Sequence, residues 1–351
     1  MSIPEIKVGE CVDLLRQEGV PEQCHLFDED SVTAIRAAIG AGRPLLVRGE
    51  PGVGKTQLAA AAAKVLRRPL VSRVVDSRTE SRDLLWEFDS VQRLAQAQLI
   101  GTLRMIDWGS AGPNETANSA GDEIARREHE VERLLAPINF IRPGLLWWAF
   151  DWNGAAEQAR LTKSRVPETG PDADSSNGVV VLIDEIDKAE SDVPNGLLEA
   201  LGQLQFDVFG RKQPVKVKNK PPLVIITTNE ERSLPAAFVR RCLVLHLDLP
   251  TDETELVERL VERARAHFKA TSLAKEAASE LDEVLRSAAA LLIADRRKCE
   301  EEGLKPLPGQ AEFLDLVRAV RALHPGGHAK QLAALQEVAR FVVIKHGETV
   351  Q

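Results

Sequence analysis

The sequence predicts an α/β fold built on a parallel sheet, followed by a smaller region made only of helices. Short apolar runs recur five times before residue 250, each bounded by Gly, Pro or charged residues. Such runs are typical of buried parallel strands, and the helical stretches between them indicate a doubly wound sheet. After Pro250 the pattern changes to continuous helical periodicity. A chain of 351 residues is long enough for one large domain and a second, smaller one.

In chain order, two helices are expected ahead of the first strand, at 8–19 and 30–41. The expected strands are 45–48, 70–75, 179–183, 223–227 and 243–247. The helices between these strands are expected at 55–66, 82–97 and 193–203. Four amphipathic helices follow the change of pattern, at 254–268, 272–293, 310–323 and 330–345.

About a hundred residues separate the second expected strand from the third, far more than a connection in a compact sheet needs. This interval contains a charged helix at 122–135 and an apolar stretch at 138–152. It also contains a polar segment at 167–178, for which we expect no packed structure. We therefore predict an insertion into the sheet domain.

The composition is that of a soluble globular protein, with 44% hydrophobic and 28% charged residues. No apolar run approaches the ~20 residues that span a bilayer, and the N-terminus lacks the pattern of a signal peptide, so we expect a cytoplasmic protein without membrane insertion. A net charge of -8 argues against general coating of nucleic acid but allows a local basic patch. Because Cys11, Cys24, Cys242 and Cys299 show no CxxC pattern or pairing with His, we expect reduced thiols.

Residues 49–56, with the sequence Gly-Glu-Pro-Gly-Val-Gly-Lys-Thr, directly follow the first expected strand and open a helix. A phosphate chain needs several converging N–H donors with no side chain in the way, which a Gly-rich turn at a helix start provides. We expect Lys55 to reach the β- and γ-phosphates and the Thr56 hydroxyl to complete a Mg²⁺ shell. The alternative, a Gly-rich turn with an incidental lysine, is disfavoured by this placement. The expected ATP-binding residues are Gly49, Glu50, Pro51, Gly52, Val53, Gly54, Lys55, Thr56 and Gln57.

Two carboxylates, Asp184 and Glu185, follow the third expected strand. Open α/β sheets bind their ligands at the carboxyl ends of the strands. We expect Asp184 to hold Mg²⁺ through water, and Glu185 to orient and polarise the attacking water. An acidic pair after a strand is by itself more often a helix cap, but the phosphate-binding loop upstream favours the catalytic interpretation.

A later strand ends near Asn229, which places an uncharged amide at the same edge of the sheet. Asn229 could position the attacking water or sense the γ-phosphate, and a simple turn asparagine is an equal alternative. Arg240 and Arg241 precede the next expected strand. Such a pair is most often surface solvation, but phosphoryl transfer can use a cation supplied by a neighbouring subunit.

Four ordered segments carry a family resemblance: residues 49–56, then Leu-Ile-Asp-Glu-Ile-Asp-Lys-Ala, then Thr-Thr-Asn, then Phe-Val-Arg-Arg-Cys. Together they resemble the AAA+ ATPases, and their detail points to the MoxR-like branch, over at least residues 30–250. The resemblance implies a P-loop NTPase sheet in the order 5-1-4-3-2 and a helical lid, with ATP between them and six subunits in a ring. The implied domains are 1–250, with a helix-2 insert at about 99–178, and 251–351.

The resemblance also implies roles for other segments. The arginine finger that acts in trans falls on Arg240 or Arg241, and we favour Arg241 because it lies next to the following strand. Residues 84–98 and 140–152 are similar to the helix and the returning portion of the helix-2 insert, and 206–218 to the pre-sensor-1 hairpin with Gly210 at its turn. In relatives both elements line the pore or face the partner.

One position departs from the family pattern. MoxR-like lids usually carry a sensor-2 arginine at the start of a lid helix, but residues 307–312 contain none. Lys305 is the nearest candidate substitute, so the coupling between lid and nucleotide is the weakest carried-over feature.

Two patches allow more than one interpretation. A basic patch around the expected hairpin consists of Arg211, Lys212, Lys216, Lys218 and Lys220. Basic loops usually face water, although a hairpin in a pore could track phosphates or grip an acidic polypeptide. An aromatic patch consists of Trp147, Trp148, Phe150 and Trp152. Packing of the insert is the favoured interpretation there, and an exposed surface for a partner is the alternative.

The sequence therefore supports two classes of function. The first is an oligomeric ATPase that remodels or activates a protein client, as MoxR-like relatives do, often together with a von Willebrand factor A domain protein. The second is a motor associated with nucleic acid, or an NTPase of a defence system, that uses the basic patch. A structural role without hydrolysis is a third possibility.

Overall fold

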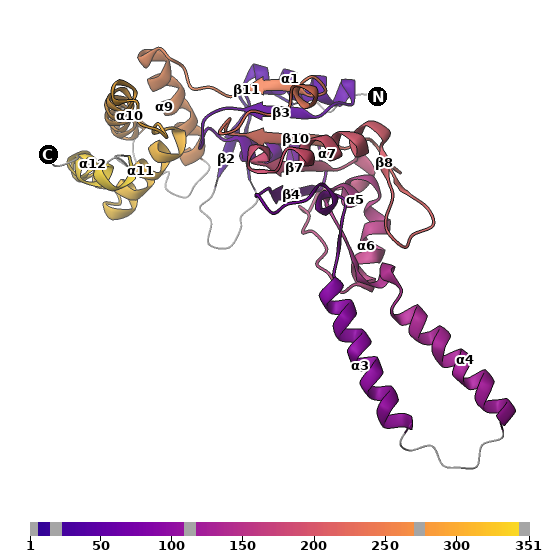
Figure 1. Ribbon diagram of the computed structural model, residues 1–351. Helices are drawn as coiled ribbons and strands as arrows, with labels where there is room; N and C mark the ends of the chain where they lie inside the picture. Colours follow the sequence, from indigo (N-terminus) through magenta and orange to yellow (C-terminus); the bar gives the residue numbers. More distant parts are fainter. Residues whose placement is uncertain (1–5, 15–22, 109–116, 270–277, 344–351) are drawn as a thin grey trace.

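The fold is organised around a parallel sheet of five strands in the order β11-β3-β10-β7-β4 (Figure 1). The computed structural model describes residues 6–14, 23–108, 117–269 and 278–343. The strands are β3 (Leu45–Arg48), β4 (Leu70–Val74), β7 (Val180–Asp184), β10 (Leu223–Thr228) and β11 (Leu243–His246). Numbered along the chain, these strands have the order 5-1-4-3-2, so the predicted α/β fold class and the positions of all five strands are confirmed.

The two faces of the sheet bury separate hydrophobic cores, because successive strand residues point to opposite faces. Leu45 and Val47 of β3 face a core shared with the C-terminal helices, whereas Leu46 faces the other core. The first core is covered by α1 (Glu29–Ala41) and α2 (Lys55–Val65). The second is covered by α5 (Leu145–Phe150), α6 (Trp152–Leu161), α7 (Asp192–Gln203) and α8 (Ala236–Val239).

Local chemistry fixes where α1 begins and ends. Asp28 is the N-cap residue, and its carboxylate accepts a hydrogen bond from the Ser31 N–H at 2.9 Å. Gly42 follows the helix in the left-handed conformation that a C-terminal glycine commonly adopts. The helix therefore ends directly before β3 and the loop that follows it.

The aromatic patch is packed inside the protein. Trp147, Trp148 and Phe150 are all buried in the core beneath α5. Trp152 is half-buried and stacks edge-on against Trp148, with ring centroids 5.0 Å apart. The packing interpretation is thus confirmed, and the apolar stretch serves to attach the insertion to the sheet.

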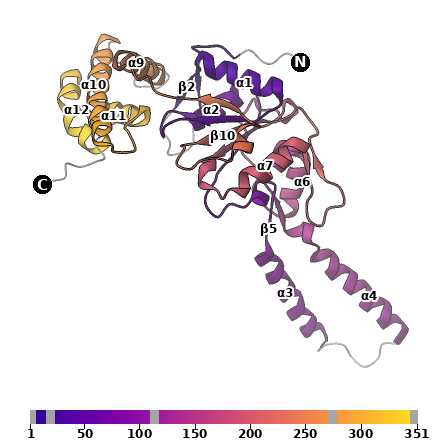
Figure 2. The same cartoon turned by 45° about the horizontal axis from the view of Figure 1, so that its top comes forward.

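A long helical projection extends from the sheet domain (Figures 1 and 2). It consists of α3 (Ser90–Trp108) and α4 (Ala117–Leu134), which we term the arm. The arm begins and ends at a two-stranded antiparallel ribbon, β5 (Trp86–Phe88) paired with β6 (Ile141–Pro143). The prediction of a helix over 82–97 was therefore wrong at residues 86–88, because pairing with β6 makes them a strand. The observed helix starts at Ser90.

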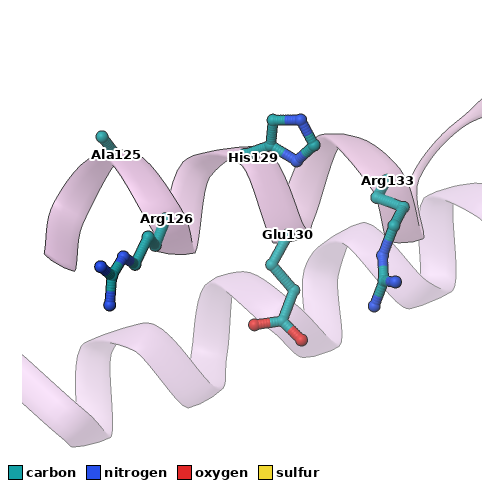
Figure 3. A pocket seen from close by; sticks show the side chains of 5 residues that line it. All are labelled: Ala125, Arg126, His129, Glu130 and Arg133. Atoms are coloured by element: carbon teal, nitrogen blue, oxygen red, sulfur yellow. The ribbon is translucent and has the colours of Figure 1, made fainter. Parts of the chain in front are cut away.

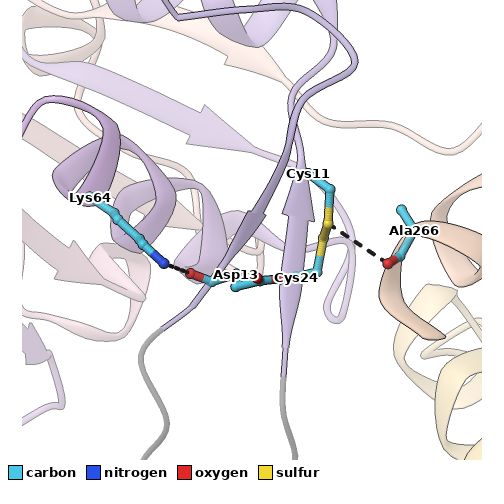
Figure 4. The surroundings of a disulfide bond; sticks show 5 residues. All are labelled: Cys11, Asp13, Cys24, Lys64 and Ala266. Atoms are coloured by element: carbon cyan, nitrogen blue, oxygen red, sulfur yellow. Dashed lines mark hydrogen bonds between the residues drawn. A yellow bond between two sulfur atoms is a disulfide. The ribbon is translucent and has the colours of Figure 1, made fainter. Parts of the chain in front are cut away.

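The N-terminal segment is a β-hairpin. Strand β1 (Cys11–Asp13) pairs with β2 (Cys24–Leu26), so a helix over 8–19 was wrong at 11–13; residues 15–19 lie outside the described part. The pairing places the Cα atoms of Cys11 and Cys24 6.0 Å apart, and a disulfide joins them (Figure 4). The expectation of reduced thiols was wrong for this pair and holds for Cys242 and Cys299. A spacing of 13 residues gives no pattern that reveals such a pairing.

The polar segment at 167–178 is tied to its surroundings, contrary to expectation. Asp174 caps the short 3₁₀ helix η3 (Ser175–Asn177), and its backbone N–H donates to the Arg67 carbonyl at 3.0 Å. Two further 3₁₀ turns lie on either side of the arm, η1 (Ser81–Leu84) before it and η2 (Pro137–Phe140) after it, and η4 (Ile186–Lys188) follows β7.

The C-terminal region is helical, as predicted, and lies to one side of the sheet (Figure 2). Its helices are α9 (Glu253–Lys269), α10 (Ala278–Glu302), α11 (Gln310–Leu323) and α12 (His328–Val342). The expected start of α10 at residue 272 lies outside the described residues. Among the helices that the structure describes, none is long and apolar enough to cross a membrane.

Candidate functional site

The loop of residues 49–54 connects β3 to α2, and close contacts require glycine at two of its positions. Gly49 has φ +149°, and a Cβ there would collide with the backbone carbonyl of Leu247. Gly52 has φ +79°, and a Cβ there would lie 2.9 Å from the Cβ of Ala311 in α11. L-residues rarely adopt these conformations. The loop is therefore held closely between the residue that follows β11 and the start of α11.

Lys55, the first residue of α2, is buried and turned back onto the loop. Its ammonium donates to the carbonyls of Gly49 at 2.7 Å and Glu50 at 2.9 Å, and to Asn229 Oδ1 at 2.7 Å. Burial lowers the pKa of Lys55, and nearby carboxylates, of which Asp184 acts most strongly, oppose that effect. The structure thus brings the predicted lysine, the loop and Asn229 into direct contact.

Thr56 and Asp184 also meet, although they are 128 residues apart in sequence. The Thr56 hydroxyl donates to Asp184 Oδ2 at 2.9 Å, and the Thr227 hydroxyl donates to Asp184 Oδ1. Thr56 is exposed, so this cluster of oxygens opens to solvent. Hydroxyl and carboxylate oxygens are the hard ligands that Mg²⁺ prefers.

Glu185 follows Asp184 in a left-handed conformation, with φ 60° and ψ 47°. Such a conformation costs a non-glycine residue about 1–3 kcal/mol and occurs preferentially at functional sites. The Glu185 N–H donates to Thr227 Oγ1 at 3.0 Å, and the carboxylate is held by Lys188 Nζ at 2.7 Å and Asn229 Nδ2 at 3.4 Å. The hydrogen bond with Glu185 raises the pKa of Lys188. The strained turn therefore aims the carboxylate at Asn229.

Several residues at the site were not identified from the sequence. Buried Asp187 accepts hydrogen bonds from the backbone N–H groups of Asn229 and Glu231, at 3.4 and 3.0 Å, and so fixes the loop after β10. Asp187, Lys188 and Thr227 all lie within the quoted motifs, which could have indicated them. No local pattern indicates Arg296 of α10, which pairs with Glu50 through both of its terminal nitrogens at 2.9 Å.

Arg240 and Arg241 do not join this cluster. Both are exposed and lie just before β11, at the amino end of the strands, whereas the loop and Asp184 lie at the carboxyl end. Their backbone carbonyls accept hydrogen bonds from Arg43, which precedes β3. Lys305 is likewise exposed, in the connection between α10 and α11. Gln57, the last of the expected ATP-binding residues, lies in α2 and donates to Gln23 Oε1 at 3.2 Å.

The expected pre-sensor-1 hairpin forms, with β8 (Gln205–Phe206) paired to β9 (Val215–Lys216) and Gly210 in the left-handed region at φ +75°. Three of the five basic residues around it contact the protein itself. Lys218 pairs with buried Asp151 at 2.9 Å, Lys220 donates to Asn177 at 3.2 Å, and Arg211 lies over the ring of Trp147. Three of the five side chains of the basic patch therefore already contact other residues of the same chain.

The loop, Lys55, Thr56 and Asp184 together fit a nucleoside triphosphate with Mg²⁺. The loop is a glycine-rich turn that packs too closely for a Cβ at Gly49 and Gly52, and it is followed by a buried ammonium and an exposed hydroxyl at the start of a helix. Lys55 and Thr56 would hold the phosphates and the metal, with Asp184 beside them.

A model of the AAA domain family, dynein-related subfamily, matches residues 44–242, which is more than half of the chain. The chain belongs to this family. The matched AAA domain begins just before β3 and ends just after Arg241, so it contains the loop, both carboxylates and Asn229. Membership of this family implies nucleotide binding, usually with Mg²⁺.

Solved structures add little to this assignment. The AAA protein is similar to a mutant of RuvB from Thermotoga maritima, with 15% identity over 89% of this chain and 69% of that chain and a TM-score of 0.42. It is also similar to PCH-2 from C. elegans, with 14% identity over 88% of this chain and 66% of that chain and a TM-score of 0.39. At TM-scores below 0.5 these likenesses carry no argument. No curated protein matches the sequence.

Two surface hollows lie away from this site. One, of about 630 Å³, is lined by residues of α4 alone, all of them exposed, with Arg126, Glu130 and Arg133 directed toward the neighbouring helix and His129 away from it (Figure 3). The other, of about 570 Å³, lies between the β1–β2 hairpin and α9. In that hairpin Asp13 accepts a hydrogen bond from Lys64 of α2, and Cys11 Sγ lies 3.7 Å from the Ala266 carbonyl oxygen (Figure 4). Cys11, Asp13 and Cys24 lie close enough together to suggest a metal site, but sulfurs joined in a disulfide offer no thiolate to a metal.

Proposed function

We propose that this AAA protein is a Mg²⁺-dependent ATP hydrolase that works as a ring of identical subunits and remodels or activates a protein partner. One observation carries the proposal: Lys55, Thr56, Asp184, Glu185 and Asn229 converge at the carboxyl edge of one sheet through direct contacts. ATP bound with Mg²⁺ would supply the phosphoryl group to be transferred. In this assignment the domains are 1–250 and 251–351.

The contacts support a division of roles among the residues. Lys55 carries a positive charge in direct contact with the loop and would neutralise phosphate oxygens. Thr56 and Asp184 share a hydrogen bond, as expected for two groups that bind one metal shell. Glu185 is the carboxylate held in a strained turn, so it is the candidate that orients and deprotonates the attacking water, with Asn229 positioning it.

The arginine pair supports a ring. Arg240 and Arg241 lie at the opposite edge of the sheet from the site of their own subunit, and both are exposed. Head-to-tail packing of identical subunits would bring them to a neighbour's site, where an arginine can stabilise the charge of the transition state. We propose Arg241 as the finger and six as the number of subunits.

The arm and the β8–β9 hairpin support a protein client. The arm projects from the sheet domain, and the hairpin packs beside the base of the arm with Phe209 exposed at its turn. We propose that both contact the client, as in the MoxR-like branch, with a von Willebrand factor A domain protein as a candidate partner. Nucleic acid is the weaker alternative, because Lys218, Lys220 and Arg211 already contact Asp151, Asn177 and Trp147 of the same chain, although both lysines remain exposed.

The decisive variant is Glu185→Gln, which removes the base and keeps the size of the side chain. We expect at least a hundredfold loss of phosphate release, with binding of a fluorescent ATP analogue retained. Glu199→Gln, on the exposed face of α7, is the matched control and should hydrolyse ATP like the wild type. Turnover by Glu185→Gln at the wild-type rate would refute the proposed mechanism.

Mixed rings test the arginine pair. Lys55→Ala lacks a working loop and Arg241→Ala lacks the finger, so each variant alone should be inactive. Mixed together, the two should regain ATPase activity, because an intact loop can then face an intact Arg241 in a neighbour. If mixing restores nothing for Arg241→Ala or for Arg240→Ala, neither arginine acts in trans.

A further inference from the structure

The C-terminal helices hold the phosphate-binding loop at three of its residues. Arg296 Nη1 and Nη2 donate to the two carboxylate oxygens of Glu50, each at 2.9 Å. Gly52 lies against Ala311, and the Val53 carbonyl accepts from Arg263 at 3.5 Å. The first contact is the strongest, because a bidentate pair of arginine and carboxylate combines charge with fixed geometry.

Arg296 is held in place for this contact. Its side chain is only 13% exposed, and its Nη1 also donates to the Pro308 carbonyl at 3.1 Å, next to the start of α11. Glu300, one turn further along α10, lies 3.4 Å from its Nε. The guanidinium is therefore positioned by α10 and by the connection to α11 before any ligand binds.

Glu50 is a problem for a loop that must accept phosphates. Its carboxylate belongs to the second residue of the loop, and it is one of the negative charges that act on Lys55. Like charges that lie close together at a protein surface repel each other, because less water screens them there than in bulk solution. An unpaired Glu50 would therefore oppose a triphosphate, and a paired one would not.

We propose that Arg296 is a positioning residue for the nucleotide: by neutralising Glu50 and holding it against α10, it keeps negative charge away from the phosphates of a nucleoside triphosphate. This inference rests on the proposed function, because it takes the loop to be the nucleotide site. It also supplies a coupling between the C-terminal helices and the loop, through Arg296 in place of the arginine that is absent from the start of α11 and in place of Lys305.

The test is titration of each purified full-length variant with fluorescent ATP and ADP analogues. Arg296→Gln exposes the charge of Glu50 and should weaken binding of the ATP analogue about tenfold, or about 1.4 kcal/mol. The ADP analogue, which carries less phosphate charge, should lose less. Arg297→Gln is the matched control: it changes the next residue of α10, whose partner is Glu253 at 3.8 Å, and should bind like the wild type.

The combined change Glu50→Gln and Arg296→Gln separates charge from shape. Removal of both charges should restore binding to within about threefold of the wild type, and Glu50→Gln alone should bind somewhat more tightly. If the double variant is as weak as Arg296→Gln, or if Glu50→Gln is equally weak, the pair only shapes the loop and the inference is wrong. Arg296→Lys keeps the positive charge but loses the bidentate geometry, so it should recover part of the affinity that Arg296→Gln loses. Binding by Arg296→Lys no tighter than by Arg296→Gln would count against a role for the charge.

Two outcomes distinguish this inference from the proposed function. A wild-type protein that binds neither analogue would contradict the proposed function itself. A wild type that binds and hydrolyses ATP, with Arg296→Gln indistinguishable from it, would overturn only the role of Arg296.

Discussion

The phosphate-binding loop and the arm are built in opposite ways. Around the loop, Val53 is 4% exposed and Leu247 6%, and contacts arrive from β10, β11, α10 and α11. On the arm, Val91 and Leu94 of α3 are 77% and 61% exposed. The loop has its geometry fixed by many independent contacts, whereas the arm is attached mainly through its base. A catalytic site needs side chains that are held in a fixed geometry, as around the loop, whereas a surface that only contacts a partner can be held as loosely as the arm.

The largest expected effect is at Lys55. Lys55→Ala removes the buried ammonium that contacts the loop and Asn229, and we expect binding of the ATP analogue to fall at least a hundredfold. Lys64→Ala on the same helix is the control, since Lys64 points outward and donates only to the Asp13 carbonyl among its described contacts. An affinity change that is equal in the two variants would mean that the loop does not bind the nucleotide.

A smaller effect is expected on the pH dependence of stability, to which the buried histidines His25 and His267 should contribute and the exposed His129 of the arm should not. Burial, together with Arg263, lowers the pKa of His25 to about 4, and burial, together with Arg318, lowers that of His267 to about 4. Below pH 6.5 the unfolded chain then binds protons that the folded protein does not, so stability is complete above that pH and falls as the pH drops toward 4. Between pH 7 and pH 5 we expect a loss on the order of 2 kcal/mol per histidine, measured by urea unfolding.

The control for this pH dependence lies on the arm. His25→Asn combined with His267→Asn should flatten the dependence, whereas His129→Asn, at an exposed position of α4, should leave it unchanged. A wild-type protein equally stable at pH 7 and pH 5 would show that neither buried imidazole stays neutral.

The smallest effect is expected from removal of most of the arm. The Arg93 side chain donates to the Leu135 carbonyl at 3.0 Å, so these positions are close enough to be joined by a short Gly-Ser linker in place of residues 94–134. ATPase activity without a client should change less than twofold, and the midpoint of thermal unfolding should fall by only a few degrees. A loss of folding would contradict the view that the arm is attached mainly through its base.

The sequence was informative where the structure depends on local patterns. Apolar runs located all five strands of the sheet, and the loop with its lysine, Asp184 and Glu185 was found from residue type and position alone. The β1–β2 hairpin, the β5–β6 ribbon and the Arg296 contact were missed. Each depends on pairing with a distant partner, such as Phe88 with Ile141, and three-residue strands carry too little periodicity to be recognised.

The β5–β6 ribbon also bears on how the chain folds. Strands β4 and β7 are neighbours in the sheet, yet Val74 and Val180 are about a hundred residues apart in sequence, a separation that slows folding. Once Phe88 pairs with Ile141, the arm no longer counts toward that separation, and the remaining loop is about half as long. Halving the length of a loop lowers the entropic free-energy cost of closing it by about 0.6 kcal/mol. If the ribbon forms first, the edge strand can find its neighbour as though the arm were absent.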